Sequence, residues 1–183
     1  MNEGTDNALL ERFEQEIWNK VPHLEEKDGE TNVVNATPLI DLTEDFKECA
    51  KSVFKIDLDN TDLKVYGKQD STLLTGSIKV RPAANIIHDA IITGKLTSGQ
   101  TVIEATSGNF GIALGLLSKL GLTVIALVSR KLQEGVFEEL RNGDIRTMDL
   151  DMDICPAPGM EGKQNLMVAK ATAANVRSQL SNL

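Results

Sequence analysis

Apolar residues near the N-terminus recur at helical spacing. Leu9, Leu10, Phe13 and Ile17 stand so that one face of a helix would carry them all. The pattern predicts an opening helix over residues 9–18, followed by a polar breaker, "PHLEEKDGETN". Such a helix packs on the rest of the fold or on a partner, and no chemistry is visible in it.

A short extended segment and a second helix come next. In "NATPLIDL", Pro38 disfavours helical geometry at the preceding Thr37. The run "EDFKECAKSVF", residues 44–54, has the spacing of a short amphipathic helix.

From Asp62 onward, short apolar strands alternate with amphipathic helices. We expect strands at 63–68, 101–105, 123–128 and 145–150, and helices at 77–94, 108–121, 132–143 and 161–180. This order predicts an α/β fold with a parallel sheet, right-handed crossovers, helices on both faces and a functional edge at the carboxyl ends of the strands. We expect an N-terminal lead-in over 1–60 and an α/β domain over 61–183.

Composition and charge restrict the classes of function. The chain has 183 residues, 41% of them hydrophobic and 25% charged, as in one soluble globular domain. The net charge of −8 and the absence of a basic run argue against nucleic acid as a partner.

Targeting signals and metal ligands are also scarce. The acidic N-terminus does not resemble a signal peptide, and no apolar run reaches bilayer length, so we expect a cytoplasmic protein without a membrane partner. Cys49 and Cys155 form no CxxC pair, and the histidines are His23 and His88 alone. We therefore expect neither a metal site nor a disulfide framework.

The first candidate for chemistry is Lys79 in "TGSIKVRPA". It lies at the predicted start of a helix, where the dipole and partial burial disfavour the ammonium form and so favour a nucleophilic amine. A solvated lysine is the simpler interpretation for a lysine taken alone.

The second candidate is the loop "ATSGNFG", between a predicted strand and a predicted helix. Its small residues Thr106, Ser107 and Gly108 allow close approach to backbone N–H groups, and Asn109 can donate or accept a hydrogen bond. The loop matches neither a dinucleotide fingerprint nor a P-loop. Taken alone it predicts either an anion cradle or an ordinary helix cap.

The motifs "NATPLIDL", "GSIKVRPAANIIHDAIITGKL" and "TVIEATSGNFGIALG", in this order, resemble the cysteine synthase-like, fold-type-II pyridoxal-phosphate enzymes. The resemblance runs from about residue 35 to about residue 170. It implies the smaller domain of that fold, preceded by an N-terminal helical lead-in.

The resemblance also implies roles for single residues. Lys79 matches the lysine that holds pyridoxal phosphate as a Schiff base and later moves the α-proton, and Asn109 matches the asparagine that contacts the cofactor ring. The loop that closes on the substrate matches Thr106, Ser107, Gly108, Asn109 and Phe110. The implied reaction is β-replacement or β-elimination on an O-activated serine-type amino acid.

Two departures from the family pattern stand out. Val80 follows the lysine where the family commonly has Asp or another small or polar residue. The glycine- and threonine-rich loop that cradles the cofactor phosphate in the second half of the family has no counterpart, and "APGMEGK" does not replace it. The cofactor should therefore bind weakly to this chain alone.

Three explanations fit a chain with half of a site: a split enzyme completed by a companion polypeptide or homo-oligomer, a fragment, or a relative used for binding or regulation. A generic nucleotide binder is disfavoured by the missing glycine fingerprint. We expect His88 to be a structural helix residue and Glu104 to cap a neighbouring helix. We also expect Arg81 with Pro82 to set the first helical turn, and the acids of 148–153 to form a strand edge.

Overall fold

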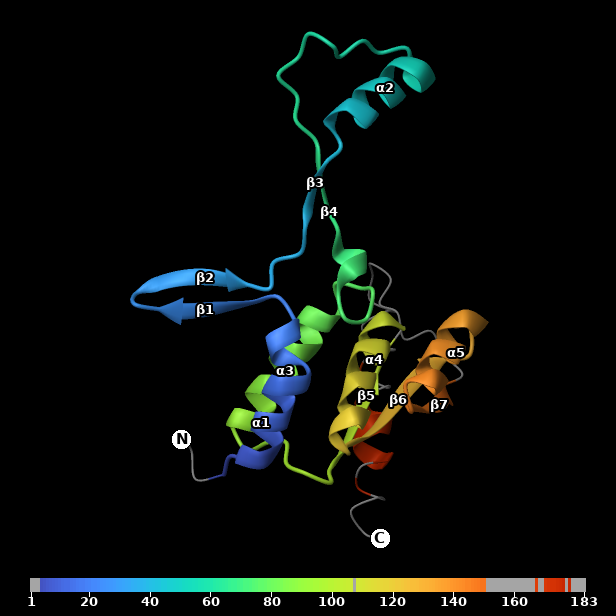
Figure 1. Cartoon of the computed structure of the whole chain (residues 1–183). Coiled ribbons are helices and arrows are strands. Elements are labelled where there is room, and N and C mark those ends of the chain that lie inside the picture. Colours follow the sequence, from blue (N-terminus) through green and yellow to red (C-terminus); the bar gives the residue numbers. More distant parts are fainter. Residues whose placement is uncertain (1–3, 107, 151–166, 168–169, 177, 179–183) are drawn as a thin grey trace.

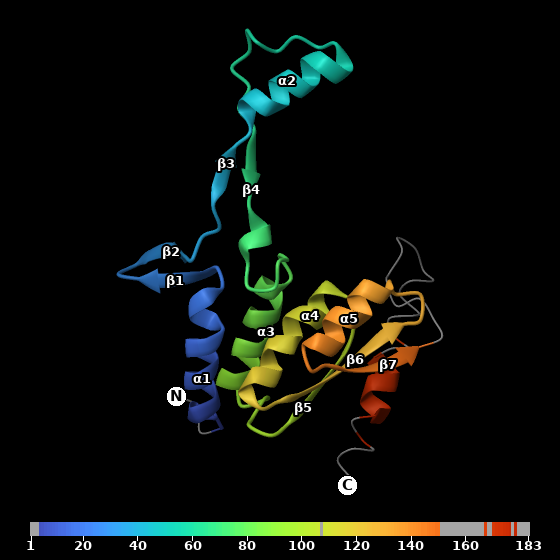
Figure 2. The same cartoon turned by 45° about the vertical axis from the view of Figure 1, so that its right-hand side comes forward.

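The computed structural model describes residues 4–106, 108–150, 167, 170–176 and 178. These residues form a compact body and a long arm that projects from it (Figures 1 and 2). We use "the body" for residues 4–21, 70–150 and 170–176, and "the arm" for residues 39–68.

A three-stranded parallel sheet lies at the centre of the body. The order is β5 (Thr101–Ala105), β6 (Thr123–Ser129), β7 (Arg146–Leu150), with Ile103 opposite Ile125 and Leu127 opposite Met148. The middle strand β6 is buried along nearly its whole length, as expected for a parallel strand covered on both faces. The expected parallel sheet is confirmed.

Helices cover the two faces of this sheet. On one face, α1 (Asn7–Glu16), α3 (Val80–Ile92), α4 (Asn109–Leu114) with its 3-10 extension η3 (Gly115–Leu120), and α5 (Glu134–Asn142) share one core with Val124, Ala126 and Val128. On the other face, Ala173 of helical residues 170–176 packs against Ile125 and Leu127. Strand alternation explains the division, because neighbouring residues of β6 point to opposite faces.

The opening helix joins the core of the body. Leu9 and Phe13 of α1 are fully buried, and the helix contacts α3 and η3. The helix ends at Glu16, and a 3-10 turn η1 (Trp18–Lys20) follows. The predicted apolar stripe is therefore the face that packs on the rest of the fold.

The predicted polar breaker is wrong, because this segment is a β-hairpin. β1 (His23–Lys27) pairs antiparallel with β2 (Glu30–Val34) around Asp28 and Gly29, whose φ angles are 55° and 80°. Two successive positive φ angles are typical of a type I′ turn, for which Asp-Gly is a preferred pair.

The arm begins with a two-stranded ribbon and ends in a helix. β3 (Leu39–Asp41) pairs antiparallel with β4 (Tyr66–Lys68), and α2 (Thr43–Phe54) lies at the far end. The strand predicted at 63–68 is therefore shorter and pairs with 39–41 instead of joining the parallel sheet. A 3-10 turn η2 (Asp70–Thr72) returns the chain to the body. Within the described residues, no helix is long and apolar enough to cross a membrane.

Candidate functional site

Lys79 occupies the position just before α3, as the sequence predicts. Its backbone N–H donates to the Ser77 hydroxyl at 3.3 Å, and Gly76 supplies the left-handed φ of 64° in the preceding turn. The next residue, Val80, is fully buried in the core. The core thus fixes the start of the helix, while the Lys79 side chain is exposed to solvent.

The burial of Val80 explains one departure from the family pattern. This side chain lies in the core with Ala113 and Leu117, so it is directed away from the exposed position of Lys79. An apolar side chain is favoured at such a fully buried position.

Thr106 is the centre of the turn between β5 and α4. Its N–H donates to the Leu127 carbonyl at 2.9 Å, which extends the parallel ladder by one residue. Its buried hydroxyl oxygen accepts from Gly108 N–H at 3.4 Å and from Gly111 N–H at 3.0 Å. Thr106 therefore holds the loop in shape, a role that the loop pattern alone does not reveal.

Two glycines of this turn are required by geometry. Gly108 has a φ of 137°, and a Cβ there would also lie 3.0 Å from Val136 Cγ1. A Cβ on Gly111 would lie 2.7 Å from Thr106 Cγ2 and 3.2 Å from Leu140 Cδ2. The turn, the first turn of α4 and helix α5 are thus packed closely together.

The structure brings the described candidate residues to one end of the body. Helix α3 precedes β5 and α4 follows it, so the N-termini of both helices lie at the carboxyl end of that strand (Figure 1). Lys79, Thr106 and Gly108 share this end with exposed Asn109 and half-buried Phe110. Ser107 lies outside the described residues.

A charged cluster beside Lys79 escaped the sequence reasoning. Arg81 donates from Nη2 to an oxygen of Asp70 and, at 3.2 Å, to the Thr37 hydroxyl. Thr37 in turn donates to Asp70 at 3.0 Å. Arg81 was expected only to set the first helical turn, but it also ties α3 to the two residues that flank the arm, Thr37 and Asp70.

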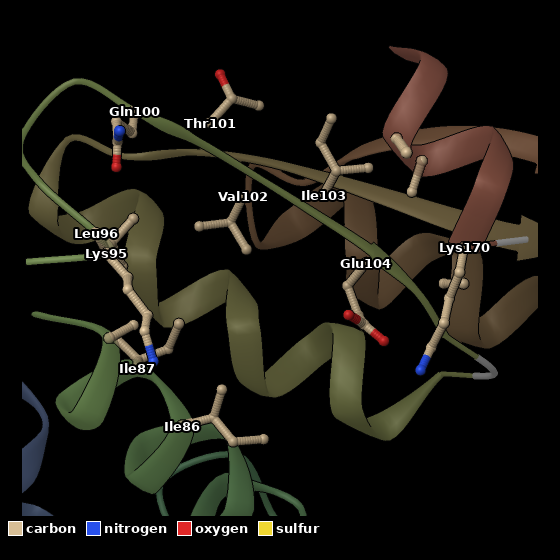
Figure 3. A pocket seen from close by; sticks show the side chains of 14 residues that line it. Ile86, Ile87, Lys95, Leu96, Gln100, Thr101, Val102, Ile103, Glu104 and Lys170 are labelled. Atoms are coloured by element: carbon tan, nitrogen blue, oxygen red, sulfur yellow. The ribbon is translucent and has the colours of Figure 1, made fainter. Parts of the chain in front are cut away.

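His88 and Glu104, which were also considered from the sequence, lie outside the Thr106 turn and face other side chains. His88 stacks on Trp18, with ring centroids 4.2 Å apart, and its Nε2 lies 3.7 Å from Glu14. Glu104 faces Lys170 across a groove (Figure 3) and caps none of the helices whose N-termini lie in the described residues. Burial raises the pKa of Glu104, and the positive charge of Lys170 partly offsets that rise.

Several sequence interpretations cannot be placed. Residues 151–153, Cys155, "APGMEGK" and most of the predicted helix at 161–180 lie outside the described residues. Among the described residues, no three His, Cys, Asp or Glu side chains gather as a metal site would require.

The family model described as "Pyridoxal-phosphate dependent enzyme" matches residues 32–157. The cysteine synthase of Aquifex aeolicus (strain VF5) is 42% identical over 64 residues, which are 34% of this chain and 20% of that protein. The chain therefore spans about a fifth of this curated relative.

Solved structures share the fold. An O-ureido-L-serine synthase superposes with a TM-score of 0.56 at 23% identity, covering 76% of this chain and 39% of that one. A pyridoxal 5'-phosphate-dependent aspartate racemase gives 0.54 at 18% identity, covering 94% and 44%. A hydrogen sulfide-producing enzyme from Fusobacterium nucleatum gives 0.57 at 21% identity, covering 76% and 40%.

The family match covers more than half of the chain and includes both Lys79 and the Thr106–Phe110 turn. The expected fold and the resemblance drawn from the motifs are confirmed by these findings. The chain belongs to the family of pyridoxal-phosphate-dependent enzymes.

Proposed function

We propose that this chain is the lysine-bearing half of a cysteine synthase-like enzyme that performs β-replacement or β-elimination on an O-activated serine-type amino acid. The observation that carries the proposal is the common location of Lys79 and the Thr106–Asn109 turn at the carboxyl end of β5. Family membership supports pyridoxal phosphate as the cofactor.

The described residues fit one part of that cofactor. An exposed amine at Lys79 can attach covalently to its aldehyde, and the exposed amide of Asn109 can hydrogen-bond to its ring. Thr75, four residues before Lys79, has a buried hydroxyl without a hydrogen-bond partner in the described residues, so a further polar group would stabilise it.

The remaining residues would bind and orient the substrate. The exposed backbone N–H of Asn109, with Ser107 in the role that the family resemblance implies, would hold its carboxylate, and Phe110 would exclude water. Lys79 Nζ would remove and return the α-proton. The bound cofactor supplies an electron sink for the charge that develops at the α-carbon.

The phosphate of the cofactor lacks an evident cradle in the described residues. A dianion contributes strongly to affinity through charge-assisted hydrogen bonds. The chain also spans only 39–44% of the solved structures just compared. The phosphate cradle would therefore lie in the part of the fold that these 183 residues do not include, and we propose that a companion polypeptide carries it.

The test is a titration of the 183-residue chain with pyridoxal phosphate, monitored by near-ultraviolet and visible absorbance. Alone, the chain should bind weakly. Coexpressed with a polypeptide that carries a glycine-rich phosphate loop, it should become yellow. Lys79→Ala should abolish the colour, whereas Lys27→Ala, in the distant hairpin, should retain it. A colour that survives Lys79→Ala would refute the assignment of this lysine.

A non-catalytic interaction protein is the second candidate. The observation that favours it is the exposed apolar surface of the arm, which includes Phe46, Val53 and Phe54. In that case the chain should bind a protein partner with unchanged affinity after Lys79→Ala, and no cofactor colour should develop in the complex.

A further inference from the structure

The hairpin of β1 and β2 projects from the body, and both of its outer backbone edges are free of other strands in the described part of the chain (Figures 1 and 2). Almost all of its residues are exposed. A two-stranded hairpin alone is marginally stable in water, and most of this one precedes residue 32, where the family match begins. Neither the family match nor the proposed function gives this hairpin a role.

The base of the hairpin is fixed to the body. His23 is buried, its ring centroid lies 4.3 Å from that of Trp18, and its Nδ1 lies 2.8 Å from the Val21 carbonyl oxygen. Asn35, the residue after β2, donates from Nδ2 to the Asn19 carbonyl at 2.8 Å. Both strands are therefore held in place at one end and exposed along the rest.

The two edges of the hairpin differ in charge. β1 carries charged side chains at Glu25, Glu26 and Lys27, whereas β2 carries one at Glu30 and continues with the uncharged run "TNVV". Charges on an edge strand oppose pairing with another chain, and β-branched residues favour it. The outer edge of β2 is therefore the one that is open to a further strand.

The register identifies the backbone groups that point out of β2. Lys27 and Glu30 flank the two-residue turn, so this pair exchanges both of its hydrogen bonds. Hydrogen-bonded and non-hydrogen-bonded pairs alternate along an antiparallel ladder. Thr31 and Val33 therefore belong to non-hydrogen-bonded pairs and direct their N–H and C=O groups outward.

We propose that β2 pairs antiparallel with β2 of a second copy of this chain, around a two-fold axis at Asn32. Thr31 of each copy would then lie opposite Val33 of the other, and each of these two pairs would exchange both hydrogen bonds. Asn32 would lie opposite Asn32, and Glu30 opposite Val34. No like charges meet across this register, so the strand is complementary to itself.

The same pairing would bring exposed apolar side chains together. Leu24 and Val33 lie opposite each other in the hairpin, with 67% and 61% exposure. In the paired strands, the two copies of Val33 become diagonal neighbours on one face, so the two Leu24–Val33 pairs adjoin. Antiparallel pairing also places the two hairpin bases at opposite ends of the new sheet, which keeps the bodies apart.

The outer edge of β1 does not offer an equivalent contact. A two-fold axis at Glu25, the corresponding position of β1, would put two carboxylates directly opposite each other. The net charge of −8 on each copy opposes association at either edge. Salt should screen that repulsion and strengthen pairing through β2.

Sedimentation of the 183-residue chain, without cofactor, tests for the dimer. The interface is small and belongs to the weak class, so a concentration range from about 10 μM to about 1 mM is needed. A dimer should form within this range and should increase with salt. Amide hydrogen exchange at Thr31 and Val33 should slow as the concentration rises, while exchange at Leu24 and Glu26, on the outer edge of β1, should stay the same.

Two proline variants separate the edges of the hairpin. Thr31→Pro removes the outward N–H of β2 in both copies and should weaken dimerisation about 5- to 150-fold, the range expected for two net hydrogen bonds. The matched control is Glu26→Pro, which removes the outward N–H of the residue directly opposite Thr31 and should leave dimerisation intact. In both variants, unchanged Trp18 fluorescence would show that His23 still anchors the hairpin base.

A charge exchange tests the position of the two-fold axis. Asn32→Lys places like charges opposite each other across the axis, although within one hairpin the new side chain faces Glu25 favourably. It should weaken dimerisation by up to about 5-fold. Mixing Asn32→Lys with Asn32→Asp should give a mixed dimer that is tighter than the dimer of either variant alone.

Three results would overturn the proposal: a monomer over the whole concentration range, equal weakening by Glu26→Pro and Thr31→Pro, or no gain from mixing the two charged variants. Concentration-dependent protection confined to α2 would assign self-association to the arm instead. These measurements use neither cofactor nor a companion polypeptide, so the proposed function can fail its colour test without deciding this proposal.

Discussion

The body and the arm both contain regular helices and strands, but they differ in how far their apolar side chains are covered. In the body, Leu9, Phe13, Val80 and Leu140 are fully buried in one core. In the arm, α2 buries only Thr43 and Ala50. Nine of the seventeen exposed large apolar residues in the described chain belong to the arm, so its helix has an apolar face without a counterpart.

The difference shows that an amphipathic pattern predicts a helix but not the surface that covers it. Phe46, Ala50, Val53 and Phe54 have the spacing of a packed helical face. The two-stranded ribbon below them is of a kind that is marginally stable by itself in water. The stability of the body should therefore be independent of the arm. Of the four measurements that follow, ordered from the largest expected effect to the smallest, three compare the body with the arm and one, on two glycines, compares two positions of the body.

The largest contrast is expected between two phenylalanines. Phe13→Ala should lower the free energy of unfolding by about 3–5 kcal/mol, because it opens a cavity in the core of the body. Phe54→Ala, at 67% exposure, should change it by less than about 0.5 kcal/mol. Trp18, the only tryptophan, lies 6.4 Å from the Phe13 ring, so its fluorescence during urea unfolding reports the body. Equal losses for both variants would contradict the independence of the two regions.

Two glycine-to-alanine substitutions should change the free energy of unfolding by smaller amounts and in opposite directions. Gly111→Ala should destabilise the body by about 1–3 kcal/mol, since the new methyl group would overlap Thr106 in the loop turn. Gly135→Ala, inside α5 and facing open space, should stabilise it by about 0.5–1 kcal/mol. Thermal unfolding of both variants measures the pair. A neutral Gly111→Ala would mean that the turn can move away from α4.

Asp6 in the body and Asp41 in the arm should affect the acid dependence of unfolding differently. Asp6 accepts from the Ser98 hydroxyl at 2.6 Å and from Leu9 N–H at 3.0 Å, and these hydrogen bonds lower its pKa to about 2. Its contribution to stability is therefore present above its ordinary pKa of 3.8 and is lost as the pH falls toward 2.

Asp41 lies in the arm, where hydrogen bonds from the side chain and backbone of Thr43 lower its pKa. Asp6→Asn should flatten the acid dependence of the Trp18 transition, while Asp41→Asn should leave that transition unchanged and alter only helical circular dichroism. An equal response of Trp18 to both variants would link the arm to the body.

The smallest effect is expected from removing the end of the arm. Asp41 pairs directly with Tyr66, so a two-residue Asn-Gly turn can replace residues 42–65 and close the ribbon as a hairpin. The free energy of unfolding reported by Trp18 should change by less than about 0.5 kcal/mol. A loss of several kcal/mol would show that the arm packs on the body in solution.

Local patterns predicted the parts of the structure that depend on neighbouring residues. Lys79 before α3 and the turn after Ala105 follow from strand, glycine and helix signals within a few positions. The Asp28-Gly29 hairpin could have been predicted by the same kind of signal, and it was missed because its strands are largely polar.

Long-range pairs could not be predicted in this way. Thr37 and Arg81 are 44 positions apart and carry no shared pattern, yet they meet beside the candidate site. Likewise, an apolar strand such as β5 looks the same in sequence whether one or both of its edges are paired. Only the arrangement of the sheet distinguishes these cases.

The Arg81 cluster makes the arm and the lysine helix mechanically dependent on each other. Thr37 precedes β3 and Asp70 follows β4, so one guanidinium holds the two chain segments that enter and leave the ribbon at the first turn of α3. A rotation of the arm about its base must either turn the start of α3 with it or break these contacts. A partner that displaced α2 at the far end of the arm would therefore also displace the first turn of α3, next to Lys79, or break the contacts of Arg81.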